Sequence, residues 1–309
     1  MLEKIPVIID CDPGLDDAVA LFMAGANEKI DIKAVTVVAG NQTLDKVGNN
    51  ALRILGFGRI DVPVAFGFEK PIVRELNIAS EVHGEDGLYG VKIPESTLKP
   101  SNLHAIDLIA KILRESNEKI TLIPMGPLTN IAMFLKIYPE LKDKIERISL
   151  MGGAINGGNR TSAAEFNIFV DPEAADIVFK SGIPITMCGL DVTQKAIVFK
   201  DDIERIKSIS NPVAKLVGEI LENLSKYHKE DGIEGCYLHD PVAVSCVANP
   251  TIIKTTPLKV DIELQGKYTT GATVGNFNKR FNYNPNADVA FDIDRETFVK
   301  EIIELMKRY

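Results

Sequence analysis

The sequence has no tryptophan, only four cysteines and no run of eighteen apolar residues. The missing tryptophan excludes any site that depends on an indole ring. A transmembrane helix needs about 20 mostly apolar residues, so we expect no membrane span. The cysteines show no Cys-x-x-Cys spacing. In a cytosolic enzyme this pattern favours buried thiols over a disulfide framework.

Two further absences concern location and partners. The segment from Met1 to Pro6 leads directly into an apolar run, without the apolar core and cleavage site of a signal peptide, which predicts a cytoplasmic protein. Acidic residues outnumber basic ones, with a net charge of -8, and no block of Lys and Arg occurs. Binding to nucleic acid is therefore not expected.

Apolar residues recur with strand and helix periodicities along the first two thirds of the chain. They predict strands over 5–10, 33–38, 120–125, 145–151 and 184–188, and helices over 16–26, 44–55, 128–137 and 172–181. Strands that alternate with helices are typical of βαβ units. The predicted fold class is therefore α/β, with an open, mostly parallel sheet flanked by helices.

The remaining segments complete this prediction. Residues 68–100 contain several Gly and Pro with little periodicity, which is typical of a long functional or mobile excursion such as a lid. Further on, the pattern predicts helices over 211–228, 240–248 and 295–308, and strands over 256–264 and 288–293. No repeat or linker is present, so we expect a single domain over 1–309.

Four carboxylates follow the first predicted strand within eight residues, in the run Asp10-Cys11-Asp12-Pro13-Gly14-Leu15-Asp16-Asp17. Helix capping explains one or two of them, at roughly 0.5 to 2 kcal/mol. Four ionised carboxylates repel one another, and a hard divalent cation with oxygen ligands offsets that repulsion. Ligands bind beyond the carboxyl ends of strands in open α/β sheets, so the position favours a metal site.

Two other clusters carry polar chemistry. Met151-Gly152-Gly153 and the stretch from Asn159 to Asn167 follow a strand without the Gly-Lys of a P-loop, and they suit either sugar hydroxyls or a Gly-rich turn. In His239-Asp240-Pro241, helix capping accounts for Asp240. It does not account for His239, which can serve a leaving group if Asp240 faces a metal.

Together these motifs resemble the inosine-uridine preferring nucleoside hydrolases. The resemblance spans the chain and rests on Asp10-Cys11-Asp12-Pro13-Gly14-Leu15-Asp16-Asp17-Ala18, Gly126-Pro127-Leu128-Thr129-Asn130, Met151-Gly152-Gly153, Glu165-Phe166-Asn167 and His239-Asp240-Pro241. It implies the nucleoside hydrolase fold with a calcium ion at the bottom of a pocket.

The resemblance also implies roles for individual residues. The calcium ligands would be Asp12, Asp17, the main-chain carbonyl of Thr129, and Asp240. Asp12 would also act as general base, while Asp10 would support the loop. The residues around the ribose would be Asp16, Asn41, Met151, Asn159, Glu165 and Asn167. An oxygen-only ligand set favours calcium over zinc.

The base end of the pocket bears on substrate choice. His239 is the main candidate for protonating the leaving group, with His83 and Tyr227 as weaker candidates. The purine-specific branch of the family stacks the base between tryptophans, which are absent here. Members that accept inosine well tend to carry an Arg on the helix over the base, and no Arg occurs between Arg205 and Arg280. We therefore expect hydrolysis of uridine and cytidine, by a homodimer or homotetramer.

Two other functions share parts of this pattern. A phosphatase of the haloacid dehalogenase type would use Asp10 as nucleophile with magnesium, but Pro13-Gly14 and Asp16-Asp17 replace the residues expected there. A non-catalytic nucleoside-binding protein would share the pocket but would not need a histidine beside a metal ligand. Ribose release with and without a chelator separates the three.

Overall fold

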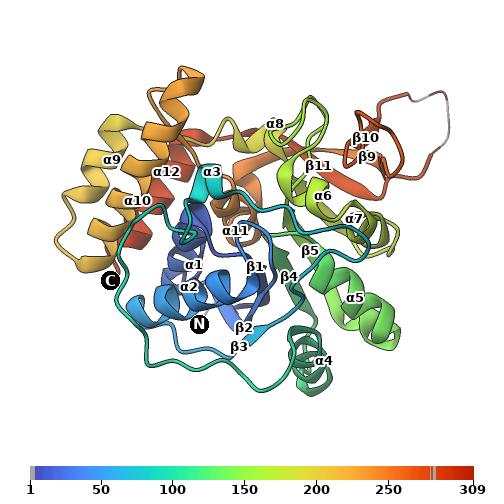
Figure 1. The fold of residues 1–309 in the computed structure, drawn as a ribbon, viewed down its shortest axis with the longest axis horizontal. Coiled ribbons are helices and arrows are strands. Elements are labelled where there is room, and N and C mark those ends of the chain that lie inside the picture. The colour runs from blue at the N-terminus through green and yellow to red at the C-terminus, as the bar shows by residue number, and fades with distance from the viewer. Residues whose placement is uncertain (1–3, 279, 281–282) are drawn as a thin grey trace.

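A nine-stranded sheet lies at the centre of the computed structural model, which describes residues 4–278, 280 and 283–309 (Figure 1). Its strands are, in spatial order, β10 (Thr273–Asn276), β9 (Ile253–Ile262), β11 (Ala287–Ile293), β6 (Ile185–Cys188), β5 (Ile145–Met151), β4 (Ile120–Pro124), β1 (Ile5–Cys11), β2 (Ile30–Val37) and β3 (Val64–Phe66). Neighbouring strands from β11 to β3 are parallel, and β9 is antiparallel to β11 and β10. The predicted open, mostly parallel sheet is confirmed.

Helices connect the strands and cover both faces of the sheet (Figure 1). They are α1 (Leu15–Ala26), α2 (Leu44–Phe57), α3 (Ser80–His83), α4 (Ala105–Glu115), α5 (Thr129–Ile137), α6 (Phe166–Val170), α7 (Pro172–Phe179), α8 (Leu190–Thr193), α9 (Lys200–Lys207), α10 (Pro212–His228), α11 (Asp240–Ala248) and α12 (Arg295–Met306). Short 3-10 turns are η1 (Pro139–Lys144), η2 (Lys229–Asp231) and η3 (Pro250–Ile252), and β7 (Ile197–Phe199) pairs with β8 (Gly235–Tyr237) in a small second sheet. Within the described residues, no helix is long and apolar enough to cross a membrane.

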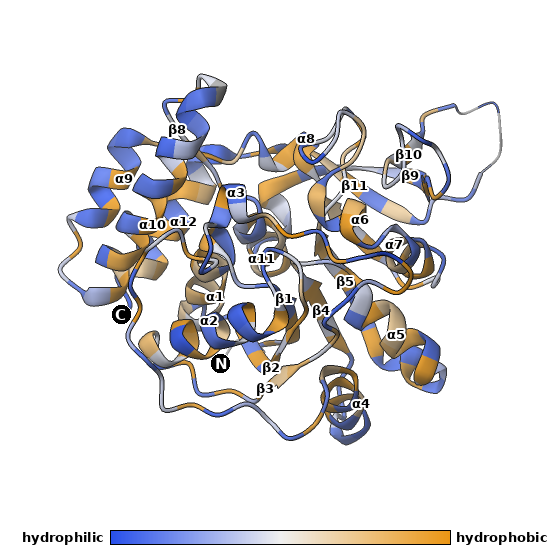
Figure 2. Cartoon of the chain, viewed as in Figure 1, coloured by the Kyte–Doolittle hydropathy of each residue, from blue (hydrophilic) through white to orange (hydrophobic). Residues whose placement is uncertain are grey.

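The alternation of side chains along β1 divides the core into two halves. Val7 and Ile9 belong to a buried cluster with α1, α2, α10, α11 and α12, whereas Ile8 belongs to a second cluster with α4, α5 and α7. The central strands are hydrophobic, and exposed helices such as α9 are largely hydrophilic (Figure 2). Burial on both faces explains why the strands read as continuous apolar runs.

The periodicity predicted the longer elements and missed several shorter ones. The strands β3 and β10 have three and four residues, too few to show a period. The helix α4 was also missed, although Ile106, Ile109 and Leu113 are buried at helical spacing. β2 begins three residues before its predicted start at Lys33, because Ile30 already pairs with Ile5.

The excursion over 68–100 has little regular structure, and α3 is the helix that the structure shows within it. It connects β3 to α4 and passes over the carboxyl ends of the strands (Figure 1). The N–H of Ala79 donates to the carbonyl of Asn41, which fixes the segment just before α3. The segment Met1 to Glu3, which entered the prediction of location, lies outside the described residues.

The four cysteines are buried and free, as predicted. The sulfur atoms of Cys188 and Cys246 are 3.8 Å apart.

Candidate active site

The site lies where the direction of the chain through the sheet reverses. β1 pairs with β2 on one side and with β4 on the other, so the loops after β1 and β4 diverge at their carboxyl ends. Such a topological switch point is where open α/β sheets bind their ligands. The run 10–17 follows β1 at this point, as the sequence predicted.

Asp10 is directed into the protein, where it braces the strands. Its Oδ1 accepts hydrogen bonds from Thr36 Oγ1 at 2.5 Å and from Asn130 Nδ2 at 2.8 Å. Burial raises the pKa of Asp10 to about 7, against the opposing effect of these two hydrogen bonds. The side chain is fully buried, and its contacts join β1 to β2 and α5.

Asp12 lies between two glycines that leave room for its carboxylate. A Cβ at Gly40 would lie 2.2 Å from Oδ2, and one at Gly126 would lie 2.6 Å from Oδ1. The N–H of Asn41 donates to Oδ2 at 2.7 Å. Within the described residues, the buried Oδ1 has no hydrogen-bond partner. Burial, followed by the charge of Asp17, raises the pKa of Asp12 well above its ordinary value.

A cluster of three buried carboxylates lies beside Asp12. One oxygen from each of Asp16, Asp17 and Asp240 lies within 4.8 Å of the other two. The first two belong to the first turn of α1, and Asp240 begins α11. Burial, with the charge of Asp16 next in importance, raises the pKa of Asp17 to about 7 and raises that of Asp240 well above its ordinary value. Such a cluster is stabilised by a cation.

This geometric cluster overlaps with the predicted ligand set without being identical to it. The sequence assigned Asp12, Asp17 and Asp240 to the metal and Asp16 to the ribose, whereas the cluster contains Asp16 and not Asp12. Asp17 belongs to both the predicted ligand set and the cluster, and it contacts Asp12 directly. Its Oδ1 accepts a hydrogen bond from the N–H of Asp12 at 3.3 Å. All four carboxylates are nearly inaccessible to solvent.

Thr129 is the first residue of α5, the helix that follows β4 along the chain. Its hydroxyl donates to Oδ2 of Asp171 at 2.6 Å. The same Asp171 oxygen accepts from the N–H of Ile72 at 2.9 Å, and the other oxygen caps α7 through Ala174. The hydroxyl proton of Thr129 is thus directed to Asp171, and the group predicted to bind a metal is its main-chain carbonyl.

The predicted ribose residues from the loop after β5 lie together. Glu165 caps α6 and accepts from the N–H groups of Gly153, Asn167 and Ile168 at 2.8 to 3.2 Å. Asn167 Nδ2 donates to the carbonyls of Met125 and Met151, which leaves Oδ1 as its acceptor toward the pocket. Asn159 Oδ1 accepts from the N–H of Phe166 at 2.9 Å.

His239 precedes Asp240 and faces the same space. Its Nδ1 lies 2.8 Å from Thr193 Oγ1, at the end of α8, and this contact fixes the orientation of the ring. Burial lowers the pKa of His239 to about 4, although the charge of Asp16 opposes the shift. The imidazole is therefore neutral at pH 7.

His83 reaches the site from the excursion. Its Nδ1 accepts from the N–H of Leu15 at 3.2 Å, at the start of α1, and its ring packs on Gly14. Burial lowers the pKa of His83. Because Nδ1 accepts a hydrogen bond, the proton of the neutral ring is on Nε2.

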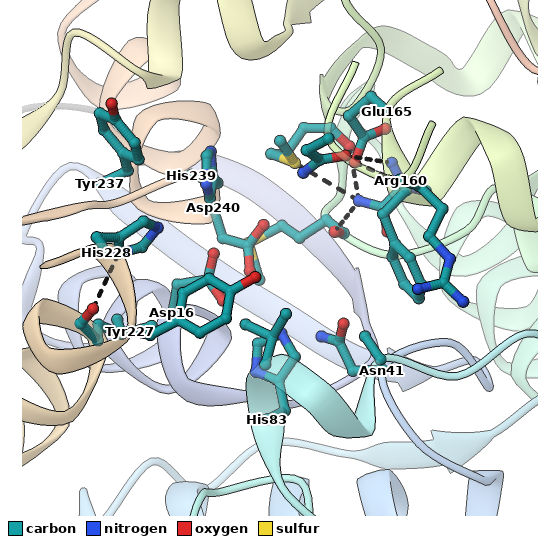
Figure 3. Close-up of a pocket in the computed structure, with 18 of the residues that line it drawn as sticks. Asp16, Asn41, His83, Arg160, Glu165, Tyr227, His228, Tyr237, His239 and Asp240 are labelled. Carbon is teal, nitrogen blue, oxygen red and sulfur yellow. Dashed lines mark hydrogen bonds between the residues drawn. The ribbon is translucent and has the colours of Figure 1, made fainter. Parts of the chain in front are cut away.

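These groups surround one cavity of about 480 Å³ (Figure 3). Of the predicted residues, those that line it are Asp16, Asn41, His83, Met151, Asn159, Glu165, Asn167, Tyr227, His239 and Asp240. Asp12, Asp17 and Thr129 do not line the cavity. The structure therefore brings together every residue that was assigned to the substrate.

Sequence reasoning did not identify several residues of this cavity, above all Glu81, Arg160, Gln194, His228 and Tyr237. The rings of His228 and Tyr237 are 4.8 Å apart at 77°, and that of His239 is 6.5 Å from His228. Together with Tyr227 they form an aromatic wall on one side of the cavity (Figure 3). The rarity of histidine and the adjacency of His228 to Tyr227 were usable signals.

Comparison with known proteins agrees with this arrangement. Residues 7–300 match the model of the family described as inosine-uridine preferring nucleoside hydrolase. The pyrimidine-specific ribonucleoside hydrolase RihA of Photobacterium profundum is 51% identical over 98% of this chain and 99% of its own length. RihA of Escherichia coli is 49% identical over 99% of both chains.

Solved structures are similar over nearly the whole chain. The plant nucleoside hydrolase PpNRh1 has a TM-score of 0.93 at 33% identity, covering 98% of this chain and 99% of its own. The purine-preferring ribonucleoside hydrolase from Gardnerella vaginalis has a TM-score of 0.91 at 31% identity, covering 98% of both chains. With its buried carboxylates at the switch point of the sheet, this chain belongs to the inosine-uridine preferring nucleoside hydrolase family.

Proposed function

We propose that this protein is a calcium-dependent hydrolase of the N-glycosidic bond of ribonucleosides, with a preference for pyrimidine bases. One observation carries the proposal: carboxylates of the buried cluster, the polar side chains of the loop after β5 and an aromatic wall with His239 line the same cavity. Each of these groups serves a different part of a nucleoside.

The carboxylates that line the cavity, and those packed directly against them, fit a hard cation. All available ligands are oxygen atoms, from Asp12, Asp17, Asp240 and the carbonyl of Thr129, and Asp12 Oδ1 is buried without a partner among the described residues. Oxygen ligands from carboxylates and a carbonyl suit calcium, which takes six to eight of them. When bound, the ion would hold ribose hydroxyls and lower the pKa of a water molecule.

Asp12 is the general base. Its Oδ2 is held by the N–H of Asn41, so Oδ1 is the atom that accepts the proton of the attacking water. The narrow space between Gly40 and Gly126 fixes the plane of the carboxylate. A fixed base within hydrogen-bond reach of the proton that it abstracts contributes about 10² to 10⁴ in rate.

The ribose is held by the side chains of Asp16, Asn41, Asn159, Glu165 and Asn167. Glycosidic cleavage passes through an oxocarbenium-like sugar, whose positive charge is stabilised by nearby carboxylates and amide oxygens. Asn167 presents Oδ1 because its Nδ2 is engaged by two carbonyls. Glu165 is held rigidly by three backbone N–H groups, so its carboxylate does not move as charge develops.

His239 assists departure of the base. As a neutral imidazole oriented by Thr193, it presents Nε2 to the cavity and can donate a hydrogen bond to the departing base when Nδ1 accepts from the threonine hydroxyl. Pyrimidine O2 lies beside the glycosidic bond, so a single donor is sufficient.

The base preference rests on the aromatic wall and on the relatives. Tyr227, His228 and Tyr237 offer aromatic surface without any indole, because the chain has no tryptophan. The two relatives that are about half identical to this chain are named pyrimidine-specific, whereas the purine-preferring structure is 31% identical. Uridine and cytidine are therefore the preferred substrates.

The phosphatase alternative lacks support from Asp10. A nucleophile must reach its substrate, but this side chain is fully buried and bound to Thr36 and Asn130. A binding protein without activity would not need a histidine, His239, beside the predicted metal ligand Asp240.

A panel of nucleosides assayed for released ribose tests the proposal. We expect uridine and cytidine to exceed inosine, adenosine and guanosine in kcat/KM. Deoxyuridine should be poorer than uridine by about 10⁴, since a site built to bind a hydroxyl rejects an analogue without it. A preference for inosine would contradict the pyrimidine assignment, and the absence of ribose release from every nucleoside would contradict the whole proposal.

A further inference from the structure

Arg160 is a charged residue of the cavity that the proposed mechanism does not use. It lies in the loop after β5, where the N–H groups of Arg160 and Thr161 both donate to the carbonyl of Ala164. Within the described part of the chain, it is the only lysine or arginine that lines the cavity. Its side chain is 28% exposed, so the guanidinium lies at the rim and not in open solvent.

The partners of Arg160 come from the excursion over 68–100. Its guanidinium donates to the Glu81 carboxylate, at the start of α3, and to the side-chain oxygen of Asn77. These contacts join two segments that are about eighty residues apart in sequence, and both Arg160 and Glu81 line the cavity. We call Arg160 and Glu81 the rim pair.

Arg160 of the rim pair lies opposite the aromatic wall (Figure 3). The wall is formed by Tyr227, His228, Tyr237 and His239, and Asp16 and Asp240 lie between it and Arg160. This places an aromatic surface at one end of the cavity, carboxylates in the middle, and Arg160 and Glu165 at the other end (Figure 3).

The covalent geometry of a ribonucleoside matches this order, an assignment that rests on the proposed function. C1′, which carries the base, and C4′, which carries the 5′-hydroxymethyl group, flank the two carbons of the diol. If the diol faces Asp16 and Asp240 and the base faces the aromatic wall, the 5′-hydroxymethyl group must point toward Arg160.

We propose that the rim pair is a specificity determinant that restricts the enzyme to ribosides without a 5′-phosphate. A nucleoside is uncharged at this end and fits beside an arginine whose charge Glu81 already balances. A 5′-phosphate carries about -1.5 to -2 charges at pH 7. It would meet the Glu81 and Glu165 carboxylates while the one arginine remains engaged.

Glu81 is the member of the pair that imposes this restriction. A guanidinium is well suited to bind phosphate through two parallel hydrogen bonds. Arg160 would therefore attract a 5′-phosphate if Glu81 did not occupy it. The same cavity can thus reject or accept nucleotides depending on a single carboxylate.

The experiment compares uridine with uridine 5′-monophosphate in the wild-type enzyme, Glu81→Gln and the double variant Glu81→Gln/Arg160→Met. We expect the wild type to favour uridine in kcat/KM by about 10² or more, since like charges brought together cost several kcal/mol. Glu81→Gln should narrow this ratio at least about tenfold, the value of one charge-assisted hydrogen bond. In the double variant this narrowing of the ratio should disappear.

Glu95→Gln is a matched control. Glu95 also belongs to the excursion and pairs with Arg53 of α2, but it does not line the cavity. This control separates a loss of charge at the rim from a general loosening of the excursion, and its substrate ratio should equal that of the wild type.

A binding measurement makes the test independent of turnover. Calorimetry should show that Glu81→Gln strengthens the binding of ribose 5-phosphate but not that of ribose. The proposal is overturned if the wild type uses both substrates equally, if Glu81→Gln leaves ratio and binding unchanged, or if the double variant keeps the narrowed ratio. Failure of the wild type to hydrolyse uridine would instead overturn the proposed function, while calorimetry would still test the rim pair.

Discussion

The main-chain N–H of Asn41 donates a 2.7 Å hydrogen bond to Oδ2 of Asp12, although the two residues are 29 positions apart in the sequence. The other oxygen of Asp12 is buried and has no partner among the described residues. One oxygen is thus held by the loop after β2, and the other remains available for a metal or a water molecule. This division supports the role of Asp12 as base.

The first prediction concerns Asp12→Asn, which keeps the size of the side chain but removes its basicity. We expect kcat to fall by at least about 10², the lower end of general base catalysis. The measurement is ribose release from uridine under saturating substrate and metal.

Asp10→Asn is the matched control for Asp12→Asn. An amide can still accept from Thr36 and Asn130 through its oxygen, so the substitution should mainly affect stability and leave kcat within about tenfold. If Asp10→Asn abolished turnover while Asp12→Asn retained it, the assignment of the base would be wrong.

The second prediction concerns calcium. We expect one ion per chain and a rise in Tm on its addition, because the ion relieves repulsion among buried carboxylates. At a calcium concentration of 100 Kd the gain is about 2.7 kcal/mol. Scanning calorimetry with and without a chelator measures it.

Two variants define the site of that effect. Asp240→Asn should weaken calcium binding, whereas Asp45→Asn, an exposed acid in the first turn of α2, should not. Zinc in the purified protein, or full activity after chelation, would refute a calcium site.

The third prediction follows from His83, whose pKa is lowered by burial. The unfolded chain binds a proton at this histidine with an ordinary pKa of about 6.5. Below that pH the unfolded state holds more protons than the folded state, so the free energy of unfolding falls as the pH falls. Protonation of Nδ1 also removes the hydrogen bond from the N–H of Leu15.

We therefore expect the stability of the wild type relative to His83→Gln to decrease between pH 7.5 and 5.5. Hydrogen exchange over 76–90 should increase over the same range in the wild type. His104→Gln is the control, because His104 likewise accepts a backbone N–H, from Ile106, but lies outside the site. If the stability of the wild type and that of His83→Gln depended on pH in the same way, His83 would not be the residue that fixes the excursion to α1.

The fourth prediction concerns His239→Ala. Removal of the hydrogen-bond donor to the departing base should lower kcat for uridine by about 10² to 10³. It should affect p-nitrophenyl riboside far less, because that leaving group departs without a proton. Equal losses on both substrates would mean that His239 does not assist the leaving group.

The sequence by itself determined the fold class and the position of the carboxylates. Apolar runs of β1, β2, β4 and β5 separated by helical patterns suffice for a parallel sheet, because these patterns are local. The run 10–17 could be placed at the end of β1 for the same reason. Family motifs then indicated the ribose residues, all of which line the cavity.

Only the tertiary structure decided how the excursion meets the site. Nothing periodic in residues 68–100 indicates that His83 accepts from Leu15, or that Glu81 pairs with Arg160. These contacts join residues 68 and 79 positions apart, and they depend on a path that the chain takes between β3 and α4. The local pattern fixes which residues form an element, whereas the packing of an irregular segment is fixed by distant partners, whose positions the local sequence does not encode.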